Sequence, residues 1–323
     1  MKINLDLLKE LEKNIDTSQP EKGKKGKIPI KILGFGEISL VFEIVNDPDN
    51  LAYKRIPIFD TEEQVKRHIW AYREYNRILR DDVGLNLPDY DTAWFKDEEG
   101  KIWFYCVQEK ALPESAGHKV IHHISEKEIE ILVLLAMREM YKVYSYSRNN
   151  KKIKFGLDGQ ISNFSIIKYN PKSPKIDTNT KLLYLDTSTP MFRINGKDAM
   201  DALLFLKSTP FFLRPIIKAA FLQEVVDRYY DWRLVTIDLI ANFFKEQKSK
   251  SIPRLIRLVN KFFAEDAKDF NIEPITVKDV IKYYKSDKMI WVIFQNARKI
   301  DRYIKTKLLR KQYVFYLPPK IKR

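Results

Sequence analysis

Cysteine is nearly absent from this sequence of 323 residues, in which Cys106 is the only one. A single cysteine cannot form a disulfide within the chain, which excludes the class of small, disulfide-rich secreted domains. The N-terminal stretch MKINLDLLKELEKNID interrupts its apolar positions with charges and does not form a signal-peptide core. The most apolar later stretch, residues 234–244, is too short to cross a bilayer and contains Asp238. These features predict a cytoplasmic protein without a membrane span.

Acidic residues are outnumbered by basic ones, with 43 aspartates and glutamates against 58 lysines and arginines and a formal net charge of +15. Such an excess favours anionic partners and raises the hypothesis of a basic nucleic-acid-binding scaffold. The sequence has no zinc-finger spacing and no aromatic RNA-binding motif that would support direct reading of bases. A general enrichment in surface lysine explains the charge more simply. The share of hydrophobic residues, 45%, is sufficient for a sizeable core in a chain of this length.

The apolar pattern changes along the chain from strand-like to helical. A charged helix with Leu5, Leu8 and Leu11 on one face comes first, and a linker rich in proline, glycine and lysine follows at 17–27. Strands are then expected at 29–36, 38–45, 51–59 and 102–112, with a helix at 61–79 between the last two.

Helical signals dominate the second part of the chain. Ser125 and Glu128 form a capping box that predicts the start of a long helix. Short strands are expected near 156–169 and 181–190, and the remainder from Lys197 is almost entirely helical in pattern. This order predicts an α+β protein with a small, strand-rich lobe followed by a larger helical lobe. The predicted division is an N-terminal helix and linker at 1–27, an N-terminal lobe at 28–110, and a C-terminal lobe with a helical extension at 111–323.

Glycine is scarce as well, with 10 residues in the chain, and four of them lie in two short segments. Gly34 and Gly36 occupy a turn between two expected strands, where glycine lets the backbone approach a ligand and point N–H groups at phosphate oxygens. Lys54, in the run LAYK of the next strand, lies within reach of phosphates held under such a turn. Glu74 follows in the expected helix, where its carboxylate is able to pair with Lys54 and orient it.

The other two glycines lie in the segment GLDGQISNF, which places Asp158 five residues before Asn163. Asp186 follows at the end of the apolar run KLLYL. Together with the glycine turn, Lys54 and Glu74, this ordered set resembles the protein-kinase-like superfamily, which includes small-molecule kinases of the aminoglycoside phosphotransferase and choline kinase type. The resemblance implies a two-lobed, protein-kinase-like fold in which GLDGQISN is the catalytic loop. It also implies that Asp158 is the base and that Asn163 and Asp186 hold the metal.

The same resemblance implies ATP and Mg²⁺ as cofactors and a hydroxyl group, expected on a small molecule, as the phosphate acceptor. The run GFGEISLV is similar to the glycine-rich loop, with Ser39 where a third glycine is usual, and YCVQEKAL stands where the hinge between the lobes is expected. The implied catalytic residues are Asp158, Lys54 and Glu74. The implied nucleotide-binding residues are Gly34, Phe35, Gly36, Ser39, Val41, Lys54, Val107, Gln108, Glu109 and Lys110.

The sequence departs from the family pattern in three places. Gly156 stands two residues before Asp158, where a histidine or a similar residue is usual, so the bracing of the loop differs. The run DTSTP lacks glycine after Asp186, which predicts a fixed aspartate rather than a switching loop. No motif like the end of an activation segment follows Pro190, which favours a small-molecule kinase over a regulated protein kinase. A catalytically weak, nucleotide-binding regulatory pseudokinase of the same fold is the alternative.

Two further clusters suggest structure rather than chemistry. His118, His122 and His123 lie close together, but neighbouring histidines on an extended segment face opposite ways and no cysteine or carboxylate completes a zinc spacing. The alternating charges of residues 227–238 are interpreted as ion pairs that brace the second lobe, in preference to an acceptor site.

Overall fold

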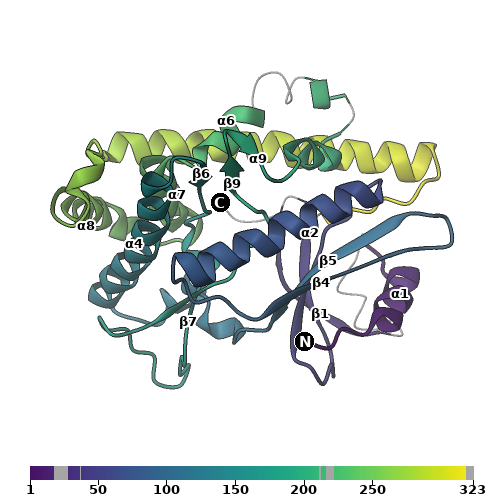
Figure 1. Ribbon diagram of the computed structural model, residues 1–323, viewed down its shortest axis with the longest axis horizontal. Helices are drawn as coiled ribbons and strands as arrows, with labels where there is room; N and C mark the ends of the chain where they lie inside the picture. The colour runs from purple at the N-terminus through teal and green to yellow at the C-terminus, as the bar shows by residue number, and fades with distance from the viewer. Residues whose placement is uncertain (18–27, 37, 211, 216–221, 318–323) are drawn as a thin grey trace.

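The computed structural model describes residues 1–17, 28–36, 38–210, 212–215 and 222–317. A small lobe built around an antiparallel sheet lies beside a larger, mostly helical lobe, and one long helix runs along both (Figure 1). The predicted α+β class, with a small antiparallel sheet and a larger helical part, is confirmed. The predicted linker, apart from Thr17, lies outside the described residues. Within the described ranges, no helix has both the length and the apolar character needed to cross a membrane.

The sheet of the N-terminal lobe has the strand order β1-β2-β3-β5-β4, and all neighbouring strands are antiparallel. Its strands are β1 (Ile30–Phe35), β2 (Leu40–Ile44), β3 (Leu51–Arg55), β4 (Tyr90–Lys96) and β5 (Ile102–Glu109). Alternate residues of β2, such as Phe42, are buried in a core shared with helix α1 (Leu5–Asn14). Because successive side chains of a strand point to opposite faces, Lys54 of β3 points away from that core.

Helix α2 (Glu62–Arg77) covers the other face of the sheet (Figure 1). Its start is stabilised by a capping box between Thr61 and Gln64, and its residues Val65 and Tyr72 pack in one cluster with Phe104 of β5. The helix then continues as a π-helical turn, η2 (Ile78–Asp82). The predicted helix at 61–79 is therefore present.

The C-terminal lobe is built on helix α4, whose predicted capping box at Ser125 and Glu128 is present. Its helices are α3 (Gly117–Val120), α4 (Glu126–Asn149), α6 (Leu222–Arg228), α7 (Trp232–Lys245), α8 (Ile252–Glu265) and α9 (Val277–Tyr303). Shorter helical turns are η3 (Pro113–Ser115), η4 (Ile161–Asn163), η5 (Ala202–Ser208), η6 (Ser249–Ser251), η7 (Lys268–Phe270) and η8 (Ile304–Leu308). Two small sheets are formed by β6 (Ile153–Phe155), β9 (Phe192–Ile194) and β10 (Lys197–Asp198), and by β7 (Phe164–Ile166) and β8 (Leu182–Tyr184).

The chain returns to the N-terminal lobe after α9 (Figure 1). Tyr313 and Phe315 are buried in the cluster that joins α2 to the sheet. Arg55, itself buried, donates from Nη1 to the carbonyl of Val314 at 2.7 Å and forms an ion pair with Glu12 of α1 at 2.6 Å. The C-terminal segment therefore extends the core of the N-terminal lobe. The sequence pattern predicted only a helical extension of the C-terminal lobe and did not indicate this return.

Candidate functional site

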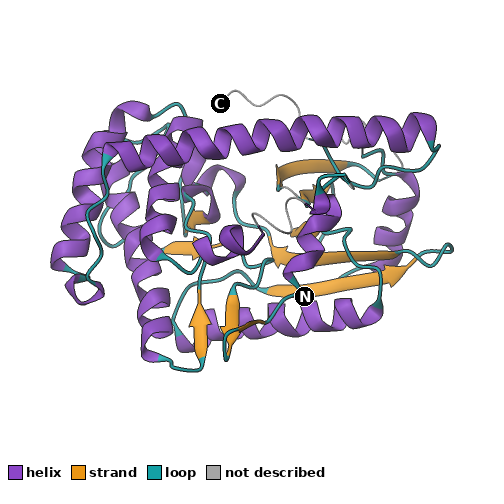
Figure 2. Ribbon diagram, turned by 90° about the horizontal axis from the view of Figure 1, so that it is seen from above, coloured by secondary structure: helices purple, strands orange, loops and turns teal. Residues whose placement is uncertain are grey.

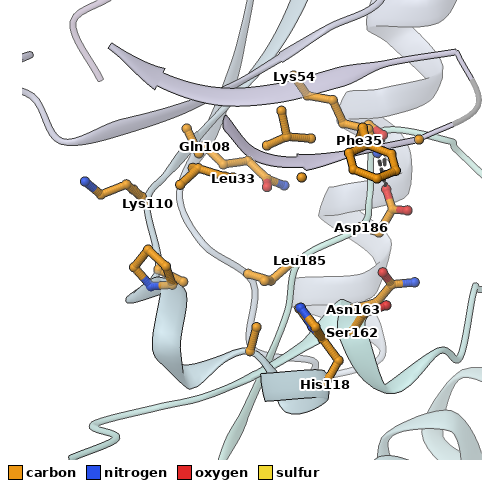
Figure 3. Close-up of a pocket in the computed structure, with 18 of the residues that line it drawn as sticks. Leu33, Phe35, Lys54, Gln108, Lys110, His118, Ser162, Asn163, Leu185 and Asp186 are labelled. Carbon is orange, nitrogen blue, oxygen red and sulfur yellow. Dashed lines mark hydrogen bonds and ion pairs between the residues drawn. The ribbon is translucent and has the colours of Figure 1, made fainter. Parts of the chain in front are cut away.

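A cleft of about 540 Å³ opens between the two lobes. Leu33, Val41 and Ala52 of the sheet line one wall, and Leu185, which follows β8, lies across from Leu33 (Figure 3). Apolar walls that face each other suit a flat, aromatic part of a ligand. Polar side chains at the ends of the cleft are able to fix the orientation of that ligand by hydrogen bonds.

The glycine turn between β1 and β2 is open toward this cleft. A Cβ atom added to Gly34 would meet no atom within 4 Å, so a ligand is able to lie close to its backbone. The N–H of Gly36 donates to the carbonyl of Ser39 at 3.0 Å and closes the turn. Phe35 lines the cleft, and its ring lies edge-on to that of Tyr316 with 5.8 Å between the ring centroids. The turn is therefore held from behind by the C-terminal segment.

Lys54 and Asp186 form an ion pair inside the cleft, with Nζ 2.7 Å from Oδ1 (Figure 3). The hydroxyl of Ser188 donates to the same carboxylate oxygen at 3.1 Å. Burial opposes the ionised form of Asp186, but the charge and hydrogen bond of Lys54 and the bonds from Ser188 outweigh burial and lower the pKa of the carboxyl. Asp186 is therefore ionised at neutral pH and offers the hard oxygen that Mg²⁺ prefers.

Glu74, the predicted partner of Lys54, lies elsewhere. It forms an ion pair with Arg77 one turn further along α2, at 2.9 Å. His68 and Tyr72 occupy the buried face of α2 instead. Burial, with the positive charge of Lys54 nearby, lowers the pKa of His68 to about 4, so this ring is neutral at pH 7. The predicted pairing is wrong because the helical period turns Glu74 about 200° away from Tyr72, to the outer face of the helix.

The loop GLDGQISNF follows β6 and is braced by backbone contacts of Gly156. The carbonyl of Gly156 accepts a hydrogen bond from the Tyr75 hydroxyl of α2 at 2.8 Å, and the Gly156 N–H donates to the carbonyl of Met191 at 2.9 Å. A Cβ atom on Gly156 would lie 2.3 Å from the carbonyl oxygen of Tyr229, and one on Gly159 would lie 2.6 Å from side-chain atoms of α4 and α7. Glycine is therefore required at both positions by close packing.

Asp158 lies half-buried in this loop. Its Oδ1 accepts the N–H of Gln160 at 3.1 Å, and the side-chain amide of Asn163 donates to its carbonyl at 3.2 Å. Burial, together with the carboxylates of Asp238 and Asp186, raises the pKa of Asp158 to about 7. Among the described residues that line the cleft, Asn163 and Asp186 are present and Asp158 is not. The loop thus places Asn163 in the cleft, where Asp186 joins it from the segment after β8, whereas Asp158 is not among the lining residues.

The end of β5 closes another end of the cleft. Gln108, Glu109 and Lys110 line it, at the place predicted for the hinge. The backbone N–H groups of Glu109 and Lys110 donate to the carbonyls of Asp89 and Asn50, at 2.8 and 3.0 Å. Both donors are therefore engaged within the protein, and a ligand at this end has to use other groups.

Two residues predicted to contact the nucleotide do not line the cleft. Val107 is fully buried in the core beneath α1, because strand alternation turns it to the opposite face from Cys106 and Gln108. Ser39 is also buried, and its contribution is the carbonyl that closes the glycine turn.

One family model matches the chain over residues 10–302, nearly its whole length, and its description is a family of unknown function, DUF6206. The chain belongs to this family. No curated protein matches it. Among solved structures it is similar to WaaP in complex with acyl carrier protein, with 13% identity, a TM-score of 0.31 and coverage of 62% of this chain and 89% of that one. It is also similar to the GDP complex of wild-type aminoglycoside 2'-phosphotransferase-IIIa, with 11% identity, a TM-score of 0.31 and coverage of 73% and 93%.

Further residues of this DUF6206 chain line the cleft although the sequence pattern did not single them out. Ala52 and Leu185 are examples, since each lies beside a predicted site residue. The two-residue period of a strand is sufficient to identify Ala52, because Ala52 stands two residues before Lys54 and its side chain shares the same face of the sheet. Leu185 precedes Asp186 directly in the irregular segment after β8, where no such period applies.

The histidine cluster has one member in the cleft. His118 of α3 lines it, with a ring nitrogen directed inward (Figure 3). Burial, with Lys119 and His122 nearby, lowers the pKa of His118 to about 4. Over the part of the chain that the structure describes, no group of three or more histidine, cysteine, aspartate or glutamate side chains could hold a metal ion.

The charged segment 227–238 separates into two environments. Its ion pairs are Arg193–Asp227 and Arg233–Asp279, at 2.5 and 2.9 Å. Asp238 is buried instead beside the catalytic-loop candidate, where its carboxylate accepts the side-chain amide groups of Gln160 and Asn242, each at 3.1 Å. The interpretation as bracing ion pairs therefore applies to Asp227 and Arg233, and Asp238 is held by neutral hydrogen-bond donors.

Proposed function

We propose that this protein is an ATP- and Mg²⁺-dependent phosphotransferase that acts on a hydroxyl group of a small molecule. The observation that carries the proposal is one cleft that brings together the glycine turn, Lys54, Asn163 and Asp186, although these lie far apart in the sequence. Phosphoryl transfer requires positioning and charge neutralisation more than covalent chemistry by the protein, and these groups supply both.

The shape of the cleft fits a nucleotide. An adenine ring would lie between Leu33 and Leu185, near the hinge residue Gln108. The phosphates would then extend toward the glycine turn, where open space beside Gly34 admits them and Lys54 supplies a positive charge.

The donor set also fits a magnesium ion. Asp186 is ionised, and the amide nitrogen of Asn163 is engaged with the carbonyl of Asp158, which leaves Oδ1 of Asn163 as its metal-binding atom. Two protein oxygens are a usual number for Mg²⁺, which keeps several waters and takes phosphate oxygens as further ligands. When bound, the metal would supply neutralisation of the phosphate charge.

Asp158 would orient the acceptor hydroxyl and accept its proton. With a pKa raised to about 7, a substantial fraction of this carboxyl is ionised at neutral pH, and it is a stronger base than an ordinary aspartate. We expect the helical part after Lys197 to select the acceptor.

The first test is a thermal-shift measurement with ATP, with and without Mg²⁺. At about 100 times its dissociation constant, Mg-ATP should stabilise the protein by about 2.7 kcal/mol. The double variant Lys54→Ala with Asp186→Ala should lose this shift, and Lys172→Ala, an exposed lysine outside the cleft, should keep it. No shift in the wild type at millimolar Mg-ATP would contradict nucleotide binding.

The second test separates an enzyme from a binding protein. A screen of hydroxyl acceptors should identify ATP turnover, and Asp158→Asn should lower that turnover roughly 100- to 10,000-fold with little change in Mg-ATP affinity. Unchanged turnover in this variant would show that Asp158 is not the base.

A regulatory pseudokinase is the second candidate, and one observation favours it. Lys54 is paired with Asp186 and has no carboxylate partner on α2, where the neutral His68 and Tyr72 occupy the buried face. This candidate predicts a Mg-ATP thermal shift without turnover on any acceptor, so the same two tests distinguish it.

A further inference from the structure

Helix α9 exposes a strip of large apolar side chains. Met289, Val292, Ile293, Ile300 and Tyr303 are each between 47% and 60% exposed. The other four stand 3, 4, 11 and 14 residues beyond Met289, and the helical period places all five within about 100° on one side of the helix. Single exposed apolar residues are ordinary, but a group of five on one side of a helix is typical of an interaction surface.

The opposite side of the same helix is already occupied. It buries Val280 and Arg298, and Arg298 donates to the carbonyl of Tyr316 at 3.0 Å. The helix also packs closely on α7 and runs along one edge of the molecule, at the top of Figure 2. The exposed strip therefore faces away from the core that holds the helix in place.

Lysines lie among these apolar residues. Lys282, Lys285 and Lys299 are exposed and fall on the same side of the helix by the helical period. We call these three lysines and the five apolar residues the α9 outer face. Further exposed cations follow it at Lys307, Arg310 and Lys311.

Carboxylates do not offset this charge. Residues 277–311 contain three, all of them described: Asp279 is paired with Arg233, Asp287 with Lys245, and Asp301 is buried. The outer face is therefore both apolar and cationic.

We propose that the α9 outer face binds the surface of an anionic phospholipid membrane, with the helix lying parallel to it. Lysines near an anionic bilayer each contribute roughly 1 kcal/mol of attraction, and apolar side chains at the same level insert at the boundary between headgroups and acyl chains. Lysine side chains are long enough to keep their charge among the headgroups while their stems lie along the apolar layer. The inference does not depend on the phosphotransferase proposal.

Two other occupants fit the charges less well. A second copy of the chain, docked through the same face, would place lysines against lysines, which is unfavourable. A nucleic acid would use the lysines but would leave Ile293 and Ile300 without a binding role, since an aliphatic side chain offers no ring for base stacking.

The test is co-sedimentation of the full chain with vesicles of phosphatidylcholine alone and of phosphatidylcholine with phosphatidylglycerol. We expect binding to the anionic vesicles and little to the neutral ones. Replacing two lysines, Lys285→Gln with Lys299→Gln, should weaken binding roughly 30-fold, at about 1 kcal/mol per lysine. Ile293→Ser with Ile300→Ser should weaken it at least about tenfold through lost apolar insertion. All four positions are exposed, so the fold should tolerate the changes, which circular dichroism checks.

A matched control changes one exposed lysine and one exposed apolar residue elsewhere, Lys172→Gln with Val45→Ser, and should bind as the wild type does. Soluble glycerol phosphate should not displace the protein, because a free phosphate ester offers no apolar layer. Equal binding to neutral and anionic vesicles, or equal binding by the isoleucine variant, would overturn the proposal. So would a concentration-dependent dimer that the isoleucine variant abolishes, or binding to an oligonucleotide in preference to the vesicles.

Discussion

Replacing Asp158 by asparagine should stabilise the protein without ligand at alkaline pH, and this prediction tests the electrostatics of the loop before any substrate is known. The structure gives Asp158 a pKa of about 7, against an ordinary value of 3.8, because the carboxyl is buried and lies near the carboxylates of Asp238 and Asp186. Its ionised form is therefore unfavourable in the folded state. Asparagine has the same size and is able to accept the same N–H of Gln160 without a charge.

The sign of the effect follows from proton binding. The folded state holds the proton of Asp158 up to about pH 7, whereas the unfolded chain releases it near 3.8, so stability falls as pH rises between these values and is level above them. At about 1.4 kcal/mol per pKa unit, the cost of ionisation at pH 8 is at most about 4 kcal/mol. The asparagine variant avoids this cost, so it should exceed the wild type in stability at pH 8 and match it near pH 4.

Asp186 should behave in the opposite way. Although burial disfavours its charge, Lys54 and Ser188 lower its pKa, so its contribution to stability is present above the ordinary value of 3.8 and is lost as pH falls through the lower folded value. Asp186→Asn should therefore destabilise the protein by about 1 to 3 kcal/mol at pH 7, the range for losing a charged hydrogen-bond partner. The difference from the wild type should shrink below pH 4.

Urea unfolding, followed by circular dichroism at pH 3, 4, 6 and 8 in EDTA, measures both effects. Asp231→Asn is a matched control, because Asp231 caps α7 through a hydrogen bond from the Leu234 N–H, and asparagine caps equally well. A loss of about 1 to 2 kcal/mol for Asp158→Asn at every pH would refute the reasoning, since it would mean that the carboxylate serves chiefly to accept the loop N–H.

Three further predictions concern the residues around the cleft. Gly156→Ala should lower the free energy of unfolding by about 1 to 3 kcal/mol or more, because its Cβ would overlap the Tyr229 carbonyl. Gly34 lies in open space, so Gly34→Ala should change the free energy of unfolding by less than about 1 kcal/mol in the same urea titration. Glu74→Gln should leave the Mg-ATP affinity measured by calorimetry unchanged and alter stability by less than about 0.5 kcal/mol, since its pairing with Arg77 is exposed; a large loss of affinity would restore Glu74 as the partner of Lys54. Tyr316→Ala should weaken Mg-ATP about two- to tenfold by removing the ring contact behind Phe35, and equal affinity would show that the C-terminal segment does not position the turn.

The sequence was sufficient to predict the strands that carry the glycine turn and Lys54, because those strands have strong apolar alternation between clear turns. Strand β4 was missed, since its run YDTAWFK mixes polar and apolar residues on both faces. The return of residues 311–317 to the N-terminal lobe was also missed. It depends on tertiary contacts with Arg55 and the α2 cluster, and such contacts leave no local pattern in a short, irregular segment.

The error at Glu74 follows from the same limit. Spacing along the chain identifies a carboxylate in the right helix, but only the rotation of that helix decides which residues face Lys54. In the structure that face carries a neutral histidine and a tyrosine, and Lys54 pairs with Asp186 instead. Phosphates and a divalent cation that entered the cleft would compete for both partners of this pair. The Lys54–Asp186 ion pair would be lost on such entry. The phosphates would supply a counter-charge for Lys54 and the cation one for Asp186, so contacts of the same kind would offset the loss.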